Sequence, residues 1–254
     1  MKIYRFERSG DVRWGALRGE ALVPLTGSIF ENPVPEGEPI PIGEVRVLAP
    51  VQPSKIVAVG RNYREHAEEM GNAPPVEPLL FLKPSTAVIG PRDAILYPAA
   101  SSRVDYEGEL AVVIRKTARG LSDAANVVDY ILGCTCLNDV TARDLQEKDK
   151  QFTRAKSFDT FAPLGPCIAA GRDPAALEIK TFLNGRLRQS SNTRHLIFPV
   201  PFLVRFISRI MTLLPGDVIT TGTPAGVGPM QPGDRVDVQI EGIGTLSNEV
   251  RKIE

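Results

Sequence analysis

Apolar and polar residues alternate along much of the chain, which is typical of strands with one buried face. Near the N-terminus, Gly and Asp separate three short predicted strands in KIYRFE, VRWGALRG and ALVPL, within residues 2–25. Apolar, β-branched runs predict further strands at SKIVAVG and YILGCTCLND. LEIKTFLNGRLRQSS predicts a hairpin, because Asn184 and Gly185 join its two alternating halves.

Helical periodicity is confined to a few segments. NYREHAEEMG predicts a helix with Asn62 as N-cap and Gly71 as stop, and VTARDLQEKDK is expected to turn helical directly after a strand. PVPFLVRFISRIMTLL is typical of an amphipathic helix with Pro in its first turn. Two Pro-Gly-Asp turns each lead into a strand. Many strands with few helices predict a β-rich mixed α+β fold.

A segment dense in Pro and Gly, NPVPEGEPIPIGE at residues 32–44, interrupts this pattern. Proline fixes φ and removes a backbone donor, so we expect a linker or a loop along a sheet edge. We therefore expect a small N-terminal β domain with its linker at residues 1–50, and a larger domain at residues 51–254. The N-terminal part is too small to be stable alone, so it is expected to pack on the rest.

Composition excludes several classes of protein. The 254 residues include 30 Lys and Arg against 30 Asp and Glu, with no basic run, so neither nucleic acid nor a membrane surface is an expected partner. No signal peptide is evident, and no segment approaches the roughly 20 apolar residues of a membrane helix. The three cysteines have no framework spacing, which indicates a reduced, cytoplasmic protein; Cys134 and Cys136 are expected on a buried strand face.

Acidic residues stand at alternate positions in RVDYEGELAVVI, residues 103–114. In one continuous strand Asp105, Glu107 and Glu109 would share a face, where like charges repel and burial increases the repulsion. A half-exposed strand with a polar face would account for the pattern. Gly108, however, indicates the close approach of a ligand or of another backbone.

A divalent cation would remove the repulsion. Asp139, where a predicted strand ends, can join Glu107 and Glu109 as oxygen ligands of Mg²⁺ or Mn²⁺, which keep positions open for water and substrate. We leave Asp105 out of this ligand set, because its side chain is expected to point past the cation.

Other polar side chains could complete a site. His66 and Glu69 share a face of a predicted helix, so Glu69 could accept the imidazole N–H and raise the basicity of a general base. Arg143 and Gln146 follow Asp139 by four and seven residues on one helical stripe and could hold a second anionic group. The alternatives are a solvated histidine and a solvent-facing Arg and Gln.

Two further segments carry candidates. Lys156 lies between a polar loop and an apolar, Pro-rich stretch, where it could act as an electrophile or a carboxylate anchor, although surface lysines are commoner. TTGTPAGVG surrounds Thr223 with glycines, and backbone N–H groups such as that of Gly222 can bind an anion. The loop lacks the spacing of nucleotide-binding motifs. His195 is expected to be structural or solvent-facing.

In this order the segments resemble the fumarylacetoacetate hydrolase family over about residues 50–254. The matching stretches are VGRNYREHAEEM, FLKPSTAVIGP, DYEGELAVVI, CLNDVTARDLQ, AKSFDTFAPLGP and PGDVITTGTPAGVG. The N-terminal extension is similar to that of bacterial members described as 2-hydroxyhepta-2,4-diene-1,7-dioate isomerases. The resemblance implies the family's C-terminal-type β-sandwich roll with a small N-terminal β domain, assembled as a homodimer.

The resemblance also implies a chemistry, in which Mg²⁺ or Mn²⁺ on Glu107, Glu109 and Asp139 stabilises an enolate of a small 2-oxo acid substrate. It assigns catalysis to His66, Glu69 and Lys156. It assigns substrate contacts to Arg143, to Gln146 and to Thr223. Thr223 lies in the loop that also contains Gly222.

Members of the family differ in which bond breaks or moves. We favour an isomerase or decarboxylase of the 2-hydroxyhepta-2,4-diene-1,7-dioate type in aromatic catabolism. The alternatives are an acylpyruvate hydrolase of the fumarylpyruvate type, an oxaloacetate decarboxylase, a ureidoglycolate lyase and a non-catalytic metal- or ligand-binding relative. His66, Glu69 and Lys156 together favour an enzyme, because a binding protein needs only the chelating carboxylates.

Overall fold

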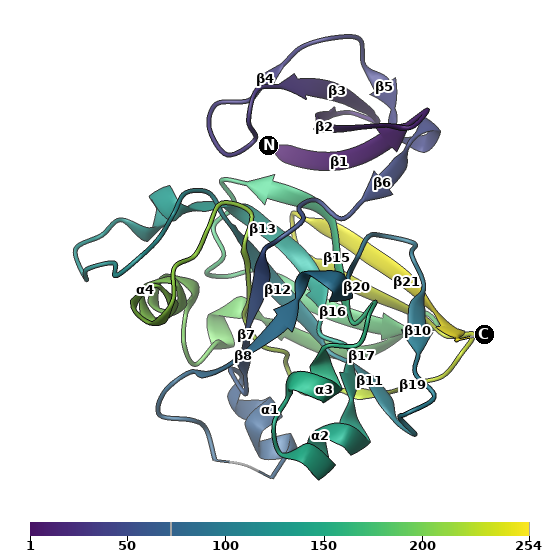
Figure 1. Ribbon diagram of the computed structural model, residues 1–254, viewed down its shortest axis with the longest axis vertical. Coiled ribbons are helices and arrows are strands. Elements are labelled where there is room, and N and C mark those ends of the chain that lie inside the picture. Colours follow the sequence, from purple (N-terminus) through teal and green to yellow (C-terminus); the bar gives the residue numbers. More distant parts are fainter. Residues whose placement is uncertain (72, 254) are drawn as a thin grey trace.

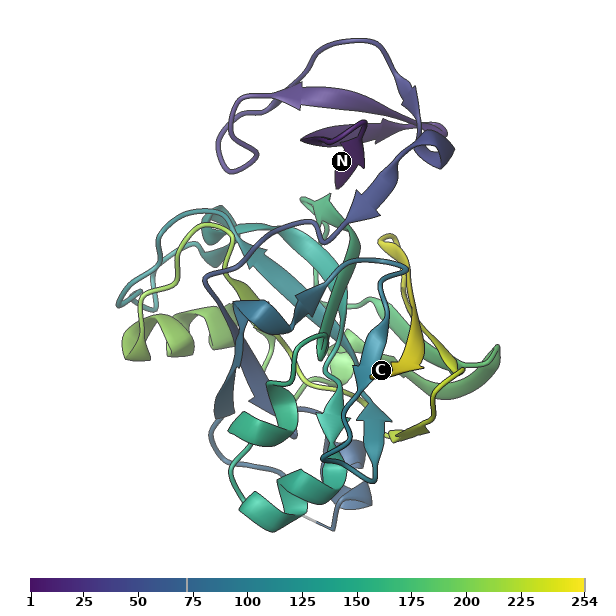
Figure 2. The same cartoon turned by 45° about the vertical axis from the view of Figure 1, so that its right-hand side comes forward.

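Strands form most of the ordered elements of the protein, which confirms the predicted β-rich mixed fold. The structure is a computed structural model and describes residues 1–71 and 73–253 (Figure 1). In Figures 1 and 2 the N-terminal strands lie at one end of the molecule and the helices α1–α3 at the other.

The largest sheet has thirteen strands, with a main path of β4-β3-β2-β1-β15-β13-β12-β18-β7-β8. Three further strands, β5, β6 and β9, pair with β3, β1 and β15. The bounds are β1 (Lys2–Arg8), β2 (Asp11–Arg18), β3 (Ala21–Thr26), β4 (Val34–Pro35), β5 (Ile40–Pro41), β6 (Arg46–Leu48), β7 (Lys55–Gly60), β8 (Leu79–Pro84), β9 (Val88–Ile89), β12 (Gly108–Ile114), β13 (Ile131–Asn138), β15 (Ala162–Ala170) and β18 (Val218–Thr220).

Two smaller sheets pack against it. The five-stranded sheet has the order β10-β21-β20-β16-β17, and the three-stranded sheet has the order β14-β11-β19. Their strands are β10 (Ile95–Tyr97), β11 (Val104–Tyr106), β14 (Thr141–Ala142), β16 (Glu178–Leu183), β17 (Arg186–Asn192), β19 (Gly228–Met230), β20 (Arg235–Ile240) and β21 (Gly244–Lys252). Val238 and Ile240 of the five-stranded sheet join Leu110 and Val112 of β12 in one buried cluster, so the core lies between the sheets.

The helices are short. They are α1 (Arg64–Glu69), α2 (Arg143–Asp149), α3 (Thr153–Lys156) and α4 (Val200–Ile210), with 3₁₀ turns at Ile42–Glu44, Ser85–Ala87, Val127–Tyr130 and Thr193–His195. The amphipathic helix was predicted correctly as α4. The predicted N-cap of α1 was wrong: Asn62 instead donates to the carbonyls of Phe198 and Thr221, at 3.0 and 2.8 Å, and so ties three segments together.

The N-terminal strands continue the main sheet. In β1, Lys2 pairs with Ala169 and Ile3 with Ile168 of β15, so the edge of one unit is joined to the other by backbone hydrogen bonds. Ile3, Phe6 and Leu22 are fully buried. The Pro-rich segment runs along this unit, where β4 and β5 pair with β3, as predicted for a loop that follows a sheet edge.

The acidic segment is not one strand, which corrects the sequence prediction. The strand is interrupted at Glu107, because β11 before it belongs to the three-stranded sheet, whereas β12 after it belongs to the largest sheet. The Asp105 side chain therefore does not join those of Glu107 and Glu109. It turns instead to the guanidinium groups of Arg103 and Arg143.

Gly108 begins β12 where the largest sheet passes close to β16. A Cβ atom there would lie 2.1 Å from Oγ1 of Thr181 in β16, so any side chain at this position would require Thr181 to move. Of the two close neighbours that Gly108 could indicate, a ligand or another backbone, the structure places another strand of the protein there.

The remaining local predictions agree with the structure. The hairpin turns at Asn184 and Gly185, whose φ angles of +53° and +75° suit a two-residue loop. Cys134 and Cys136 are buried in β13, and burial raises the pKa of the Cys134 thiol to about 12. Among the described residues, no helix is long and apolar enough to cross a membrane.

Candidate metal centre

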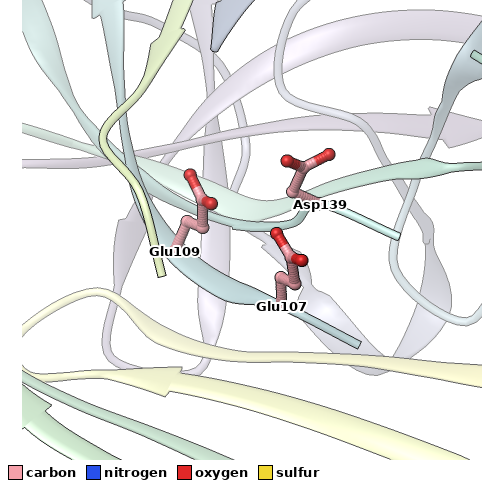
Figure 3. A group of neighbouring side chains, drawn as sticks. All are labelled: Glu107, Glu109 and Asp139. Atoms are coloured by element: carbon pink, nitrogen blue, oxygen red, sulfur yellow. The ribbon is translucent and has the colours of Figure 1, made fainter. Parts of the chain in front are cut away.

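Three carboxylates converge where two antiparallel strands of the largest sheet end. Gly108 pairs with Asn138, so Glu107 and Glu109 at the start of β12 lie beside Asp139 at the end of β13. The backbone N–H of Asp139 donates to the Glu107 carbonyl at 2.8 Å. One oxygen of each carboxylate lies within 4.8 Å of the other two, and all three residues are at least 95% buried (Figure 3).

Two buried lysines neutralise part of this charge. The Lys156 ammonium donates to Glu107 at 2.7 Å and to Asp139 at 2.6 Å, while that of Lys83 donates to the other Asp139 oxygen at 2.5 Å. Burial lowers the pKa of Lys83 despite its contact with Asp139. For Lys156, burial acts in the same direction, but the charges of Asp139 and Glu107 outweigh it and raise the pKa. Lys156 has two carboxylate partners and Lys83 has one, which accounts for the opposite directions of the two pKa shifts.

Arg143 fixes Glu107 from the other side. Its guanidinium donates to Glu107, to Asp105 at 2.9 Å and to the side-chain oxygen of Gln146 at 2.6 Å. Burial alone would raise the pKa of Glu107, but the charges of Lys156, Arg143 and His66 lower it below its ordinary value. Glu107 is therefore held as a carboxylate. The sequence predicted Asp139, Arg143 and Gln146 on one helical stripe. Only Arg143 and Gln146 lie on α2, because Asp139 precedes the helix and β14 lies between them.

Glu109 differs from the other two acids. Within the described residues no Lys or Arg pairs with it, and both of its hydrogen bonds, from the Thr220 hydroxyl and from the Gly222 N–H at 2.8 Å, go to Oε2. Burial, with the charges of Asp139 and Glu107, raises the pKa of Glu109 well above its ordinary value. A buried carboxylate without a cationic partner is costly, so a cation at this point would be stabilising.

The glycine-rich loop shapes this contact. Gly222 has a φ of +96°, and a Cβ there would lie 2.8 Å from the Cβ of Asn62, so glycine allows its N–H to reach Glu109. Thr223 donates from its hydroxyl to the Gly108 carbonyl at 2.8 Å and accepts from Gln189 at 2.8 Å. The structure places Gly222 and Thr223 beside the carboxylates; their contact with substrate stays a prediction.

His66 and Glu69 form the predicted pair on α1. The His66 Nδ1 atom lies 3.1 Å from a Glu69 carboxylate oxygen, and the Gly226 N–H donates to the other oxygen at 3.0 Å. His66 is 6% exposed, so it is not the solvated helix residue that its local sequence allows. The second histidine, His195, is exposed, as predicted.

One cavity of about 400 Å³ connects these groups. Its lining includes Glu107, Glu109, Asp139, His66, Lys156, Arg143, Gln146 and Thr223, together with Val59, Gly60, Arg61, Met70, Phe81, Glu147, Lys150 and Phe152. Almost all predicted site residues thus face one space. Lys83 was not predicted, although it stands in the FLKP stretch, because nothing local indicates that its strand passes beside Asp139.

The residues fit a hard divalent cation. Three carboxylates supply oxygen ligands, the donor type that Mg²⁺ and Mn²⁺ prefer, and Glu109 has no other cationic partner in the described part of the chain. Lys83 contacts Asp139, and Lys156 contacts both Asp139 and Glu107, so each of these two acids has a lysine partner that Glu109 lacks in the described part of the chain.

Comparison with protein families matches both parts of the chain. The family model described as "Fumarylacetoacetate (FAA) hydrolase C-terminal" matches residues 55–251, and the model described as "Rv2993c-like, N-terminal" matches residues 1–50.

Individual proteins are similar over most of the chain. The solved structure of 2-hydroxyhepta-2,4-diene-1,7-dioate isomerase from Mycobacterium marinum has a TM-score of 0.92 and 45% identity, covering 99% of this chain and 98% of its own. Maleylpyruvate hydrolase from Sphingobium sp. SYK-6, solved with manganese(II) and pyruvate, has a TM-score of 0.82 and 32% identity, covering 100% of both chains. Oxaloacetate tautomerase YisK of Bacillus subtilis is 42% identical over 224 residues, covering 82% of this chain and 74% of its own.

Proposed function

Because this chain belongs to the fumarylacetoacetate hydrolase family, we propose that it is a divalent-cation-dependent isomerase that moves a proton in a 2-oxo acid or its enol. The substrate is of the 2-hydroxyhepta-2,4-diene-1,7-dioate type, as in the printed name of the M. marinum relative. The observation that carries the proposal is the buried carboxylate trio in one cavity with an oriented histidine.

The trio and the histidine have separate tasks. Glu107, Glu109 and Asp139 would hold Mg²⁺ or Mn²⁺, which when bound supplies Lewis-acid stabilisation of negative charge on the 2-oxo oxygen. In the tautomer whose Nδ1–H donates to Glu69, the Nε2 atom of His66 has a free lone pair and can accept a proton from substrate carbon. Glu69 is anchored by the Gly226 N–H, so the imidazole orientation is fixed from outside the cavity.

Lys156 can assist at the substrate oxygen. Lys156 is 2% exposed, and its ammonium touches both Glu107 and Asp139 and lies 5.2 Å from the centre of the Phe81 ring. A charged donor in such a dry place stabilises an oxyanion more strongly than it would in water.

Hydrolysis of an acylpyruvate is the second candidate. The same His66–Glu69 pair could deprotonate a water molecule for attack on a carbonyl, and the chain is similar to a maleylpyruvate hydrolase over its full length. Tautomerisation of oxaloacetate needs proton transfer without water attack, as in the isomerase, and is the reaction in the name of the B. subtilis relative.

The experiment is an ultraviolet assay of 2-hydroxyhepta-2,4-diene-1,7-dioate, acetylpyruvate, fumarylpyruvate and oxaloacetate, each with Mg²⁺, Mn²⁺ or EDTA. We expect cation-dependent isomerisation of the first compound to be the fastest reaction and to be abolished in Glu107→Ala and Asp139→Ala. Turnover that survives EDTA would contradict the proposal, and acylpyruvate cleavage as the fastest reaction would establish the second candidate.

His66→Ala then tests the role of the base, with the exposed His195→Ala as its control. Isomerisation should fall by about 10²-fold or more in His66→Ala and stay unchanged in His195→Ala. Decarboxylation of oxaloacetate, in which no water is activated, should fall less than acylpyruvate cleavage does.

A further inference from the structure

Two cations that the mechanism does not use line the cavity and are partly or fully exposed, and we call this exposed rim the mouth of the cavity. Arg61 follows β7 and is half-buried, and Lys150 follows α2 and is exposed; both line the same cavity as the carboxylate trio. Within the described residues neither side chain forms a hydrogen bond or an ion pair. Long charged side chains that border a cavity without a partner are available to a ligand.

Both residues have a backbone that favours glycine. Arg61 has a φ of +57° and Lys150 a φ of +60°, and Lys150 occupies the left-handed position that ends α2, where glycine is the usual residue. Non-glycine residues held in such conformations cluster at active sites and ligand-binding sites. Two of them on one cavity are an observation independent of their charge.

Aromatic side chains in the lining suit an unsaturated or aliphatic chain. Phe81 and Phe152 line the cavity, and their rings meet edge to face with centroids 5.2 Å apart. Glu147 also lines the cavity, so Arg61 and Lys150 outnumber it by two cations to one acid.

We propose that Arg61 and Lys150 form a subsite for the distal carboxylate of the substrate and thereby select 2-oxo dicarboxylates over 2-oxo monocarboxylates of equal length. This inference rests on the proposed function, which places the 2-oxo acid end at the trio. Two charged donors at the far end would add ionic hydrogen bonds to a second carboxylate and none to a methyl group.

Titration calorimetry of the full chain loaded with Mn²⁺ tests the subsite, with 2-oxoadipate and 2-oxohexanoate as probes. The two probes have the same length and differ in a terminal carboxylate against a methyl group. We expect 2-oxoadipate to bind about tenfold or more tightly than 2-oxohexanoate. Arg61→Gln and Lys150→Gln should each weaken binding of 2-oxoadipate alone, and the double variant should abolish the preference.

Arg92→Gln is the matched control, since Arg92 is exposed, has a φ of +67° and lies outside the cavity lining. Its affinities for both probes should equal those of the wild type. Lys150→Gly separates strain from binding: it should raise the melting temperature while weakening 2-oxoadipate binding, whereas a structural role for Lys150 would lower both.

The possible outcomes distinguish a failure of the proposed subsite from a failure of the proposed function. Equal affinity of the wild type for both probes, or a proportional loss of both in the variants, overturns the subsite and leaves the proposed function standing. Failure of the Mn²⁺-loaded wild type to bind either probe overturns the proposed function, and the subsite with it.

Discussion

Glu109 is the residue at which the electrostatic balance of the site is incomplete. Glu107 and Asp139 each contact an ammonium or guanidinium group, whereas across residues 1–71 and 73–253 Glu109 receives hydrogen bonds only from Thr220 and Gly222. Without a cation its charge is repelled by two buried neighbours. Electrostatic repulsion at Glu109 therefore destabilises the metal-free fold, although the same carboxylate is needed as a metal ligand.

Glu109→Gln should remove this repulsion while keeping the shape of the side chain. We expect the metal-free variant to melt at a higher temperature than the wild type, by roughly 2–4 °C for each kcal/mol gained. Mn²⁺ should stabilise the wild type and not the variant, because one oxygen ligand is lost. Scanning calorimetry with EDTA and with Mn²⁺ measures both effects. Glu249→Gln, at an exposed position, is the control, and a lower melting temperature for metal-free Glu109→Gln would contradict the account.

Asp144 gives a prediction about pH. It accepts hydrogen bonds from Ser101 at 2.6 Å and from Ser102 at 2.9 and 3.0 Å. Burial opposes its charge, but these donors together outweigh it and lower the pKa of Asp144 from 3.8 to about 2. A lowered pKa stabilises the fold above the unfolded value, and this contribution is lost as the pH falls toward 2.

Asp144→Asn should therefore cost about 1 kcal/mol at pH 7 and progressively less between pH 4 and pH 2. Urea unfolding across this range measures the difference. Asp123→Asn serves as control, because the Asp123 side chain is 90% exposed. A cost for Asp144→Asn that does not change with pH would assign the effect to shape instead of charge.

Single residues were predictable where a local pattern carried the chemistry. Glu107 and Glu109 were singled out because acids at alternate positions repel, Asp139 because it ends a predicted strand, and His66 with Glu69 because of their helical spacing. The structure brings the three acids together and pairs His66 with Glu69, while their roles stay predictions. Lys83 was not found, and Asp105 was set aside without a role. Their contacts with Asp139 and Arg143 depend on which strands become neighbours, and a single segment does not contain that information.

At the level of elements, the break between β11 and β12 determines the geometry. The chain leaves the three-stranded sheet and enters the largest sheet within one residue, and Gly108 passes close to β16. The Thr181 hydroxyl, buried against Gly108, has no hydrogen-bond partner among the described residues. The close approach of Gly108 to β16 thus leaves the Thr181 hydroxyl buried without a hydrogen bond in the described structure.

Gly108→Ala should destabilise the fold by about 1–3 kcal/mol, because the new methyl group overlaps Thr181. Thr181→Ala alone should be nearly neutral, since it removes an unpaired group. The double variant should recover most of the loss, since the next atoms lie 3.3 Å from the new Cβ. Urea unfolding of the four proteins gives the coupling. Additive effects would show that the overlap with Thr181 is not the cause.

Elements with a strong local signal were predicted well. The Asn-Gly hairpin, the apolar strand β7 and the amphipathic helix α4 follow from turn chemistry and periodicity. The strand break at Glu107 was missed, because alternation continues through it and only pairing with different sheets divides it. Asn62 was mistaken for a helix cap because its long-range partners at Phe198 and Thr221 lie outside its own segment.

For the whole molecule, the N-terminal strands and the larger part share a sheet. Ile3 is fully buried, pairs with Ala16 on one side and Ile168 on the other, and packs in a cluster with residues of β12 and β15. The division at residue 50 and the homodimer stay predictions. The continuous sheet indicates that the two parts unfold together.

Ile3→Ala should therefore lower the stability of the entire chain by about 2–5 kcal/mol. We expect one unfolding transition, at the same urea concentration by fluorescence and by loss of Mn²⁺ binding. Val12→Ala, at a position that is 44% exposed, is the control and should change little. Two separate transitions in Ile3→Ala would show that the N-terminal unit unfolds alone.

The floor and the mouth of the cavity come from different segments of the chain. The carboxylates stand on paired strands in the interior, whereas Arg61 and Lys150 follow β7 and α2. Substitutions at the mouth can accumulate during evolution without disturbing the reactive end. With the proposed subsite at these two positions, the acid that the protein selects can change while the reactive end stays the same, and a laboratory selection aimed at Arg61 and Lys150 should retune preference within few mutational steps.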